Sequence, residues 1–88
     1  MNATEQLVYD YGRAVRRRSD EQRLGARHMT KRLESLQQAE WELYQRMVAA
    51  GVARGNIIDK TYRAYYLAGV MDWSLDKVRR IFKLEITA

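Results

Sequence analysis

Hydrophobic positions between residues 29 and 51 recur at the spacings of one face of an α-helix. The stripe begins at Met29 and passes through Leu43, and Glu40 interrupts it. Gly51 follows as a C-terminal cap, because glycine readily takes the left-handed conformation in which many helices end. The pattern therefore predicts a helix over this range. Its apolar face is widened by Trp41, Tyr44 and Val48.

This stripe is narrow enough to form a seam with another helix. It could close a helical hairpin within the chain or a short coiled coil between two chains, and its length does not choose between them. A small chain buries a modest share of its surface alone, which favours a homodimer. The residues expected at the dimer interface are Leu33, Leu36, Leu43 and Met47.

A first helix is expected from about residue 3 to residue 18. Asn2 and Glu5 have the spacing of a capping box at its start, and Gly12 weakens it slightly. Few apolar residues lie between residues 18 and 28. We expect a break or bend there, with one continuous long helix as the alternative.

Two further helices are expected in the second half of the chain. Asn56 would cap the third helix, which carries isoleucines and a cluster of tyrosines and ends at Gly69. The tyrosines are expected mostly in the core, with their hydroxyl groups at its rim. Asp72 or Ser74 would then cap a fourth helix, over residues 75 to about 85.

The composition also favours helices. The 88 residues include no proline and five glycines, which fits helices joined by glycine turns better than a sheet. No repeat or linker divides the chain. We expect a single all-α domain over residues 1–88: a bundle of about four helices, with a helical hairpin or long helices at 3–50 and a helix-turn-helix-like corner at 56–86.

That corner, YYLAGVMDWSLDKVRRIFKLEIT at residues 65 to 87, has the pattern of a helix, a turn at Gly69 and a second helix. Such a pair can form a helix-turn-helix that reads DNA. Trp73 is expected to be a packing anchor in the turn. The alternative is a short amphipathic helix that closes the bundle. The residues expected to contact DNA from this segment are Asp76, Lys77, Arg79, Arg80 and Lys83.

The run YYLAGVMDWSL resembles the entry to the helix-turn-helix of sigma factor region four and of phage late-gene regulators and antiterminators. The resemblance implies a DNA-binding transcriptional regulator of the kind that phages and mobile elements encode. In that family's frame the helix from Leu75 supports a reading helix that follows it, and since the sequence stops at Ala88, the protein in this frame would work through other proteins. In a repressor-like frame, with Gly69 in the turn, the last helix itself reads DNA.

The net charge is +5, and bases are concentrated between residues 13 and 32. If this stretch is helical throughout, its basic face can follow a phosphate backbone. Asp20 lies on the same face, and Asp20 or Glu21 can pair with arginines at helical spacing, so a solvated charged face is the alternative. The residues expected to contact phosphates are Arg13, Arg16, Arg17, Arg23, Arg27 and Lys31.

The sequence shows no catalytic constellation. Cysteine is absent, His28 has no second metal ligand near it, and the run AAGVARGN lacks the lysine of a phosphate-binding loop. We therefore expect no enzyme activity, no metal ion and no organic cofactor. No segment has the length and apolarity of a membrane span or signal peptide, which favours a cytoplasmic protein.

These features favour a small basic regulator that binds double-stranded DNA as a homodimer. Its terminal helix would enter the major groove, and its arginines would hold phosphates. The alternative is a helical interaction module that binds and modulates a host protein without contacting DNA. The two hypotheses differ in what the basic faces touch.

Overall fold

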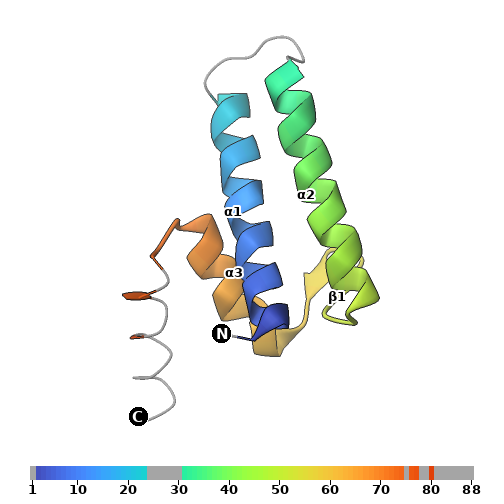
Figure 1. The fold of residues 1–88 in the computed structure, drawn as a ribbon, viewed down its shortest axis with the longest axis vertical. Helices are drawn as coiled ribbons and strands as arrows, with labels where there is room; N and C mark the ends of the chain where they lie inside the picture. Colours follow the sequence, from blue (N-terminus) through green and yellow to red (C-terminus); the bar gives the residue numbers. More distant parts are fainter. Residues whose placement is uncertain (1, 24–30, 75, 78–79, 81–88) are drawn as a thin grey trace.

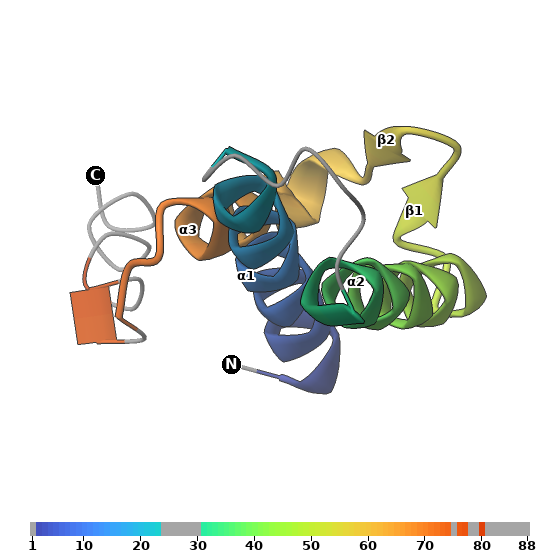
Figure 2. The same ribbon diagram turned by 90° about the horizontal axis from the view of Figure 1, so that it is seen from above.

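Helix α1 (Ala3–Arg23) lies between the two other helices, with α2 (Lys31–Ala49) on one side and α3 (Arg63–Val70) on the other (Figure 1 and Figure 2). An antiparallel hairpin and a 3-10 turn connect α2 to α3. The computed structural model describes residues 2–23, 31–74, 76–77 and 80. Over these residues the protein is mostly helical, as the sequence predicts. The connecting elements are β1 (Ala53–Arg54), β2 (Ile57–Ile58) and η1 (Lys60–Tyr62).

Helix α1 begins at the predicted capping box. The Asn2 N–H donates to Glu5 Oε1 at 2.8 Å, and the Glu5 N–H donates to Asn2 Oδ1 at 2.8 Å. Each side chain thus satisfies a backbone donor that has no partner within the helix. The helix then continues past residue 18 to Arg23. Ion pairs of Asp20 with arginines one turn away stabilise this last part.

Gly51 ends α2, as the sequence predicts. Its φ of 77° lies in the left-handed region, and its N–H donates to the Val48 carbonyl at 3.0 Å. The Val52 N–H donates to the Met47 carbonyl at 3.0 Å. These bonds satisfy carbonyls at the helix end and bring Val52 into the buried cluster with Met47 and with Val8 of α1.

A hairpin stands where the sequence predicted the start of the third helix. Asn56 does not cap a helix, because it forms a turn with Gly55 between the paired residues Arg54 and Ile57. Gly-Asn between two apolar runs is a hairpin-turn sequence, and Gly55 takes a φ of 60°. The prediction was wrong because asparagine suits turns as well as helix caps, and isoleucine suits strands. The third helix begins only at Arg63.

The predicted turn at Gly69 is also displaced. Gly69 lies inside α3, which ends at Val70, and the left-handed residue of the turn is Asp72, with a φ of 57°. The Asp72 N–H donates to the Gly69 carbonyl and the Trp73 N–H to the Ala68 carbonyl, both at 3.0 Å. Aspartate tolerates the left-handed conformation, so this helix end did not need a glycine.

Gly69 and Gly12 instead allow α3 and α1 to cross closely. A Cβ added to Gly12 would lie 2.3 Å from the Tyr66 carbonyl oxygen, and one added to Gly69 would lie 2.3 Å from the Tyr9 carbonyl oxygen. No larger residue fits this crossing without moving a backbone. Gly12 is therefore the contact point of two helices as well as a locally unfavourable helix residue.

The predicted fourth helix falls mostly outside the described residues. Ser74 Oγ accepts a hydrogen bond from the Lys77 N–H at 3.2 Å, which matches one of the two caps that the sequence predicts. Residues 76, 77 and 80 are helical. The described part thus contains three helices and a short hairpin, and a four-helix bundle with a helix-turn-helix corner stays a prediction.

Candidate interaction groove

Four aromatic rings form a continuous chain of contacts across the three helices. Trp41 and Tyr44 of α2 stack with centroids 5.8 Å apart, and Tyr44 is 6.2 Å from Tyr11 of α1. Tyr11 in turn stacks on Tyr66 of α3 at 5.8 Å. The chain joins residues that lie on three different helices, so the tertiary fold alone brings it together.

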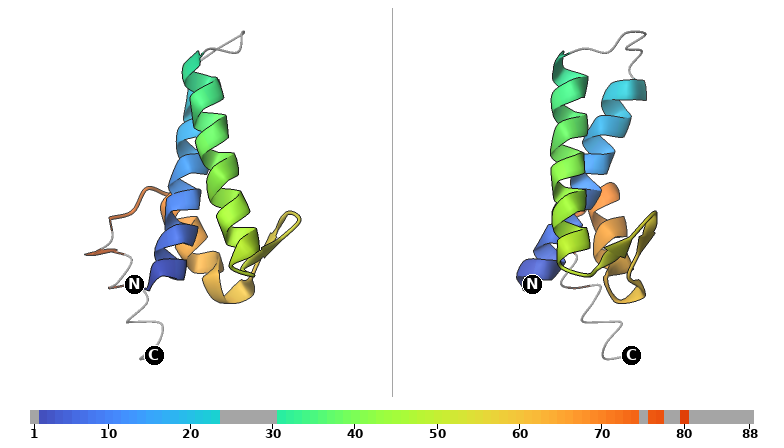
Figure 3. Two further views of the ribbon diagram at one scale, coloured as in Figure 1. Left: turned by 45° about the vertical axis from the view of Figure 1, so that its right-hand side comes forward. Right: turned by 90° about the vertical axis from the view of Figure 1, so that its right-hand side faces the viewer.

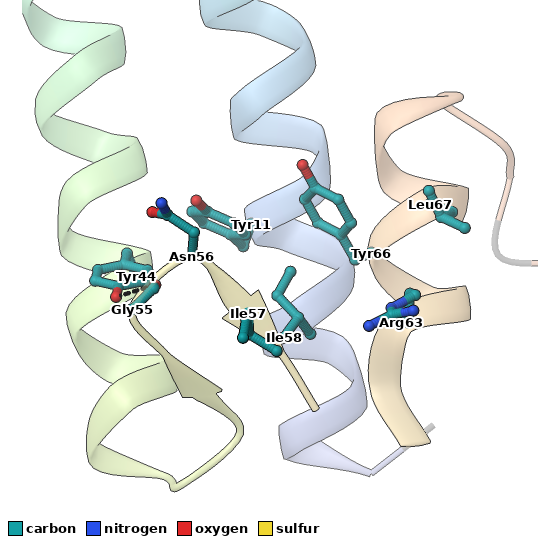
Figure 4. A pocket seen from close by; sticks show the side chains of 9 residues that line it. All are labelled: Tyr11, Tyr44, Gly55, Asn56, Ile57, Ile58, Arg63, Tyr66 and Leu67. Carbon is teal, nitrogen blue, oxygen red and sulfur yellow. Dashed lines mark hydrogen bonds between the residues drawn. The ribbon is translucent and has the colours of Figure 1, made fainter. Parts of the chain in front are cut away.

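These rings line a groove that crosses α1 between α2 and α3. One hollow, of about 310 Å³, is lined by Tyr11, Tyr44 and Tyr66, by the hairpin and by α3 (Figure 4). A second hollow, of about 360 Å³, shares Tyr11, Tyr44 and Asn56 with the first and extends along α2. The hairpin lies at the end of the molecule where α1 begins and α2 ends, and it bounds the groove there (Figure 3).

Large apolar side chains stand exposed along this groove. Trp41 is 55% exposed, Ile57 is 67% exposed and Leu67 is 52% exposed, and all three line the hollows. A small folded protein rarely groups large apolar residues at its surface unless another molecule covers them. The groove is therefore the best candidate for a binding site in the described part of the chain.

Polar contacts fix the shape of the groove. The Tyr44 hydroxyl donates to the Gly55 carbonyl and ties the hairpin turn to α2. At the other end, Arg18 Nε lies 2.7 Å from Glu40 Oε2, joining α1 to α2. The hydrogen bond to Glu40 raises the pKa of Arg18. Burial, followed by the charge of Glu40, raises the pKa of the Tyr11 phenol, which stays neutral at physiological pH.

Arg63 brings a positive charge to the hairpin end of the groove. It is the first residue of α3, its side chain is exposed, and in Figure 4 it is directed toward the isoleucines of β2. Among the described residues it has no ion-pair partner. At one end of the groove the charge of Arg18 is therefore balanced by Glu40. At the other end Arg63 can pair with a bound molecule.

Two residues of the predicted phosphate-binding stripe are used inside the fold. Arg13 Nε lies 3.4 Å from Asp72 Oδ1, and Arg16 Nη1 donates to the Val70 carbonyl at 2.9 Å. Arg16 Nε also pairs with Asp20 Oδ2 at 2.9 Å, one of the pairs that the helical spacing predicts. These contacts hold α1 to the C-terminal end of α3 and reduce the charge available to a polyanion.

The other residues of the predicted phosphate-binding stripe that the structure describes are more exposed to solvent. Arg17, Arg23 and Lys31 are exposed, and Arg23 Nη2 lies 3.8 Å from Asp20 Oδ1. Arg27 lies outside the described residues. Because Arg18 and Arg32 pair with Glu40 and Glu21, much of the basic charge of residues 13 to 32 is compensated within the fold.

The predicted DNA-reading residues are described in part. Asp76, Lys77 and Arg80 are exposed, whereas Arg79 and Lys83 lie outside the described residues. Trp73 packs against the buried Tyr9 and Ala68, as expected of an anchor. Lys77 Nζ lies 4.5 Å from the centre of the Trp73 ring, a cation–π contact that occupies this base in part.

The four residues predicted at a dimer interface differ in how deeply they are buried. Leu33 and Met47 are buried within the single chain, at 4% and 0% exposure, while Leu36 and Leu43 are partly buried. Helix α2 instead leaves Trp41 and Val48 exposed, at 55% and 43%, and Trp41 lines the groove. A second copy would therefore find its apolar contacts at the groove more readily than at Leu33 or Met47.

Sequence reasoning did not identify the groove. Trp41 and Tyr44 appear in the sequence only as a widening of the apolar stripe of α2. That widening is the available signal, because a helix that packs on one neighbour needs a narrower stripe. The position of Ile57 depends on the hairpin, where the sequence predicts a helix, and Arg63 becomes the first residue of α3 because that helix begins later than expected.

No metal site or membrane span is found among the described residues. They bring together no group of three or more His, Asp or Glu side chains that could hold a metal ion, and His28 lies outside them. None of the described helices has both the length and the apolarity required to cross a bilayer.

Comparison with known proteins does not assign the chain to a family. No protein-family model matches the chain, and neither a curated protein nor a solved structure matches it significantly.

Proposed function

We propose that this protein is a helical interaction module whose groove binds a segment of a partner protein. The observation that supports this most directly is the grouping of exposed Trp41, Ile57 and Leu67 around two adjoining aromatic-lined hollows. Apolar concavities with a few polar groups at their edges are the usual form of a binding site. From the sequence this function is the alternative to DNA binding, and the exposed apolar residues of the groove support it more directly.

The free energies of burial and of association indicate what contacts such a partner must make. Full burial of one large apolar side chain stabilises by about 1.5–3 kcal/mol. Since the three side chains are between about half and two thirds exposed, covering all of them contributes on the order of 4 kcal/mol. Association costs roughly 4–15 kcal/mol in lost freedom, so these three contacts do not suffice alone. A partner must also contact the aromatic floor and a polar group of the groove.

Site-specific photo-crosslinking in the cells that carry the gene tests this proposal. A benzophenone amino acid replaces Ile57 at the groove, and a matched control variant carries it at the exposed Ser35 of α2, which lies outside the hollows. We expect a discrete protein adduct at position 57 and not at position 35. An adduct of the mass of two chains would indicate a homodimer, and a nuclease-sensitive adduct would indicate nucleic acid; either result overturns the proposal.

DNA binding is the second candidate function, and one observation favours it. Arg13 and Arg16 contact Asp72 and Val70, so the basic face of α1 lies against the end of α3, which leads into the exposed residues Lys77 and Arg80. In this proposal the protein is a dimeric regulator with a helix-turn-helix-like corner. Its exposed bases contact phosphates, and Arg80 reads base edges.

Fluorescence anisotropy with DNA duplexes tests the second candidate. Arg17→Ala should weaken binding to all sequences alike and flatten the salt slope by about 0.9. Arg80→Ala should cost about 1–3 kcal/mol on a preferred sequence alone. If the wild-type protein binds no duplex at about 50 mM salt, where nonspecific contacts are strong, DNA binding is excluded.

A further inference from the structure

We infer that the partner segment carries a carboxylate next to an apolar anchor, and that this carboxylate pairs with Arg63. The inference rests on the proposed function and specifies the chemistry of the groove's occupant. The anchor would lie on the aromatic floor at Tyr11 and Tyr66, and the carboxylate would meet the guanidinium at the hairpin end.

The distribution of charge supports an acidic occupant. Between residues 53 and 67 the bases are Arg54, Lys60 and Arg63, and all three are exposed. The acid in this range is Asp59, whose carboxylate already accepts the Thr61 N–H at 2.9 Å. Of the three bases, Arg63 lines the hollow itself, and a carboxylate beside it would gain a charge-assisted hydrogen bond.

At the opposite end of the groove the positive charge is already paired. Arg18 is only partly exposed and is held by Glu40 through two hydrogen bonds, of 2.7 and 3.2 Å. Breaking this pair would leave one charge without its partner, which is unfavourable in a partly buried place. The other polar groups of the hollow along α2 include the neutral amides of Gln37 and of Asn56, the hairpin residue that both hollows share, and these amides can bind peptide backbone. This asymmetry orients the occupant with its acid toward Arg63.

The arrangement of the rings favours a peptide over a nucleic acid. Nucleobases bind by stacking on free aromatic faces. Here Tyr11 stacks on Tyr66 with an interplanar angle of 27°, and Trp41 stacks on Tyr44 at 26°, so the rings already use faces against one another. The exposed aliphatic residues Ile57 and Leu67 offer apolar contact and no stacking surface. An acidic segment with an aliphatic or aromatic anchor fits these contacts better.

Selection from a phage-displayed library of random dodecapeptides against the immobilised full chain tests the inference. We expect enrichment of peptides that combine acidic and large apolar residues. A selected peptide should then bind Arg63→Gln about tenfold or more weakly than wild type, as the loss of one charge-assisted hydrogen bond predicts. Arg46→Gln makes the same change of charge at an exposed position of α2 outside the groove and should bind normally. Circular dichroism checks that each variant is folded.

The possible outcomes separate this inference from the proposed function. Apolar peptides without acids that bind wild type and Arg63→Gln equally would overturn the acidic occupant and leave a protein-binding groove. If no selected peptide binds wild type more tightly than the folded variant Trp41→Ala, both proposals fail. Both also fail if a single-stranded oligonucleotide of the same length binds in an Arg63-dependent manner while no peptide does, or if light scattering shows a dimer that Trp41→Ala dissociates.

Discussion

The crossing of α1 and α3 at Gly12 and Gly69 makes a sharp prediction for Gly69→Ala. The new Cβ would lie 2.3 Å from the Tyr9 carbonyl oxygen, 2.9 Å from the Arg13 nitrogen and 3.0 Å from the Gly12 Cα. All three are backbone atoms, and ordinary contacts between heavy atoms are about 3.5–4.0 Å long. The two helices must therefore separate by about 1 Å, since no side chain can rotate away.

Helix propensity and overpacking change the stability of Gly69→Ala in opposite directions. Alanine is favoured over glycine within a helix by about 1 kcal/mol. Overpacking typically costs about 1–3 kcal/mol and occasionally more, and the backbone neighbours at Gly69 place the cost at or above the upper end of that range. We expect a net loss of about 2 kcal/mol in the free energy of unfolding, or about 8–16 °C in Tm for a domain of this size.

Urea denaturation and thermal melting, both followed by circular dichroism, measure this loss. Gly51→Ala is the contrasting variant, because an added Cβ there meets no atom within 4 Å and its cost comes from the φ of 77° alone. The double variant Gly12→Ala/Gly69→Ala should lose less than the sum of the two single losses, since one separation of the helices relieves both clashes. If Gly69→Ala is as stable as wild type or more stable, helix propensity outweighs the contact and the reasoning is refuted.

Three further predictions concern stability. Met47→Ala should lower the free energy of unfolding by about 2–5 kcal/mol, because this side chain is fully buried; a loss below about 1 kcal/mol in urea would contradict its place in the core. Asn2→Ala should cost about 1 kcal/mol by removing the cap of α1, and Asn2→Asp should retain most of the stability. Burial, and then a hydrogen bond with Glu5, raise the pKa of Tyr65 to about 12 from an ordinary value of 10.0. The stability contributed by the neutral phenol is therefore present below pH 10 and lost as the pH rises toward 12. Near-ultraviolet absorbance titration should show a late-ionising tyrosine that Tyr65→Phe removes, and a Tyr65 that titrates with the other tyrosines would contradict this environment.

The sequence by itself determined the features that depend on near neighbours along the chain. Asn2 and Glu5 make the capping box of α1, Gly51 ends α2, and Asp20 pairs with arginines one helical turn away. Each depends on residues within about one helical turn, whose geometry the helix fixes in advance. For the same reason the helical class could be predicted from periodicity and composition.

Only the tertiary structure decided how the distant parts are used. Gly69 lies at a helix crossing because Gly12 faces it, and nothing in the local sequence of either glycine announces the other. Asn56 and Ile57 suit a helix start or a hairpin, and the hairpin places its neighbours Ala53 and Ile58 against the core. The groove joins rings from three helices, and Arg16 of α1 donates to the Val70 carbonyl at the end of α3, a contact that its local sequence does not announce. Contacts between residues far apart in the chain have no fixed spacing, and therefore periodicity cannot reveal them.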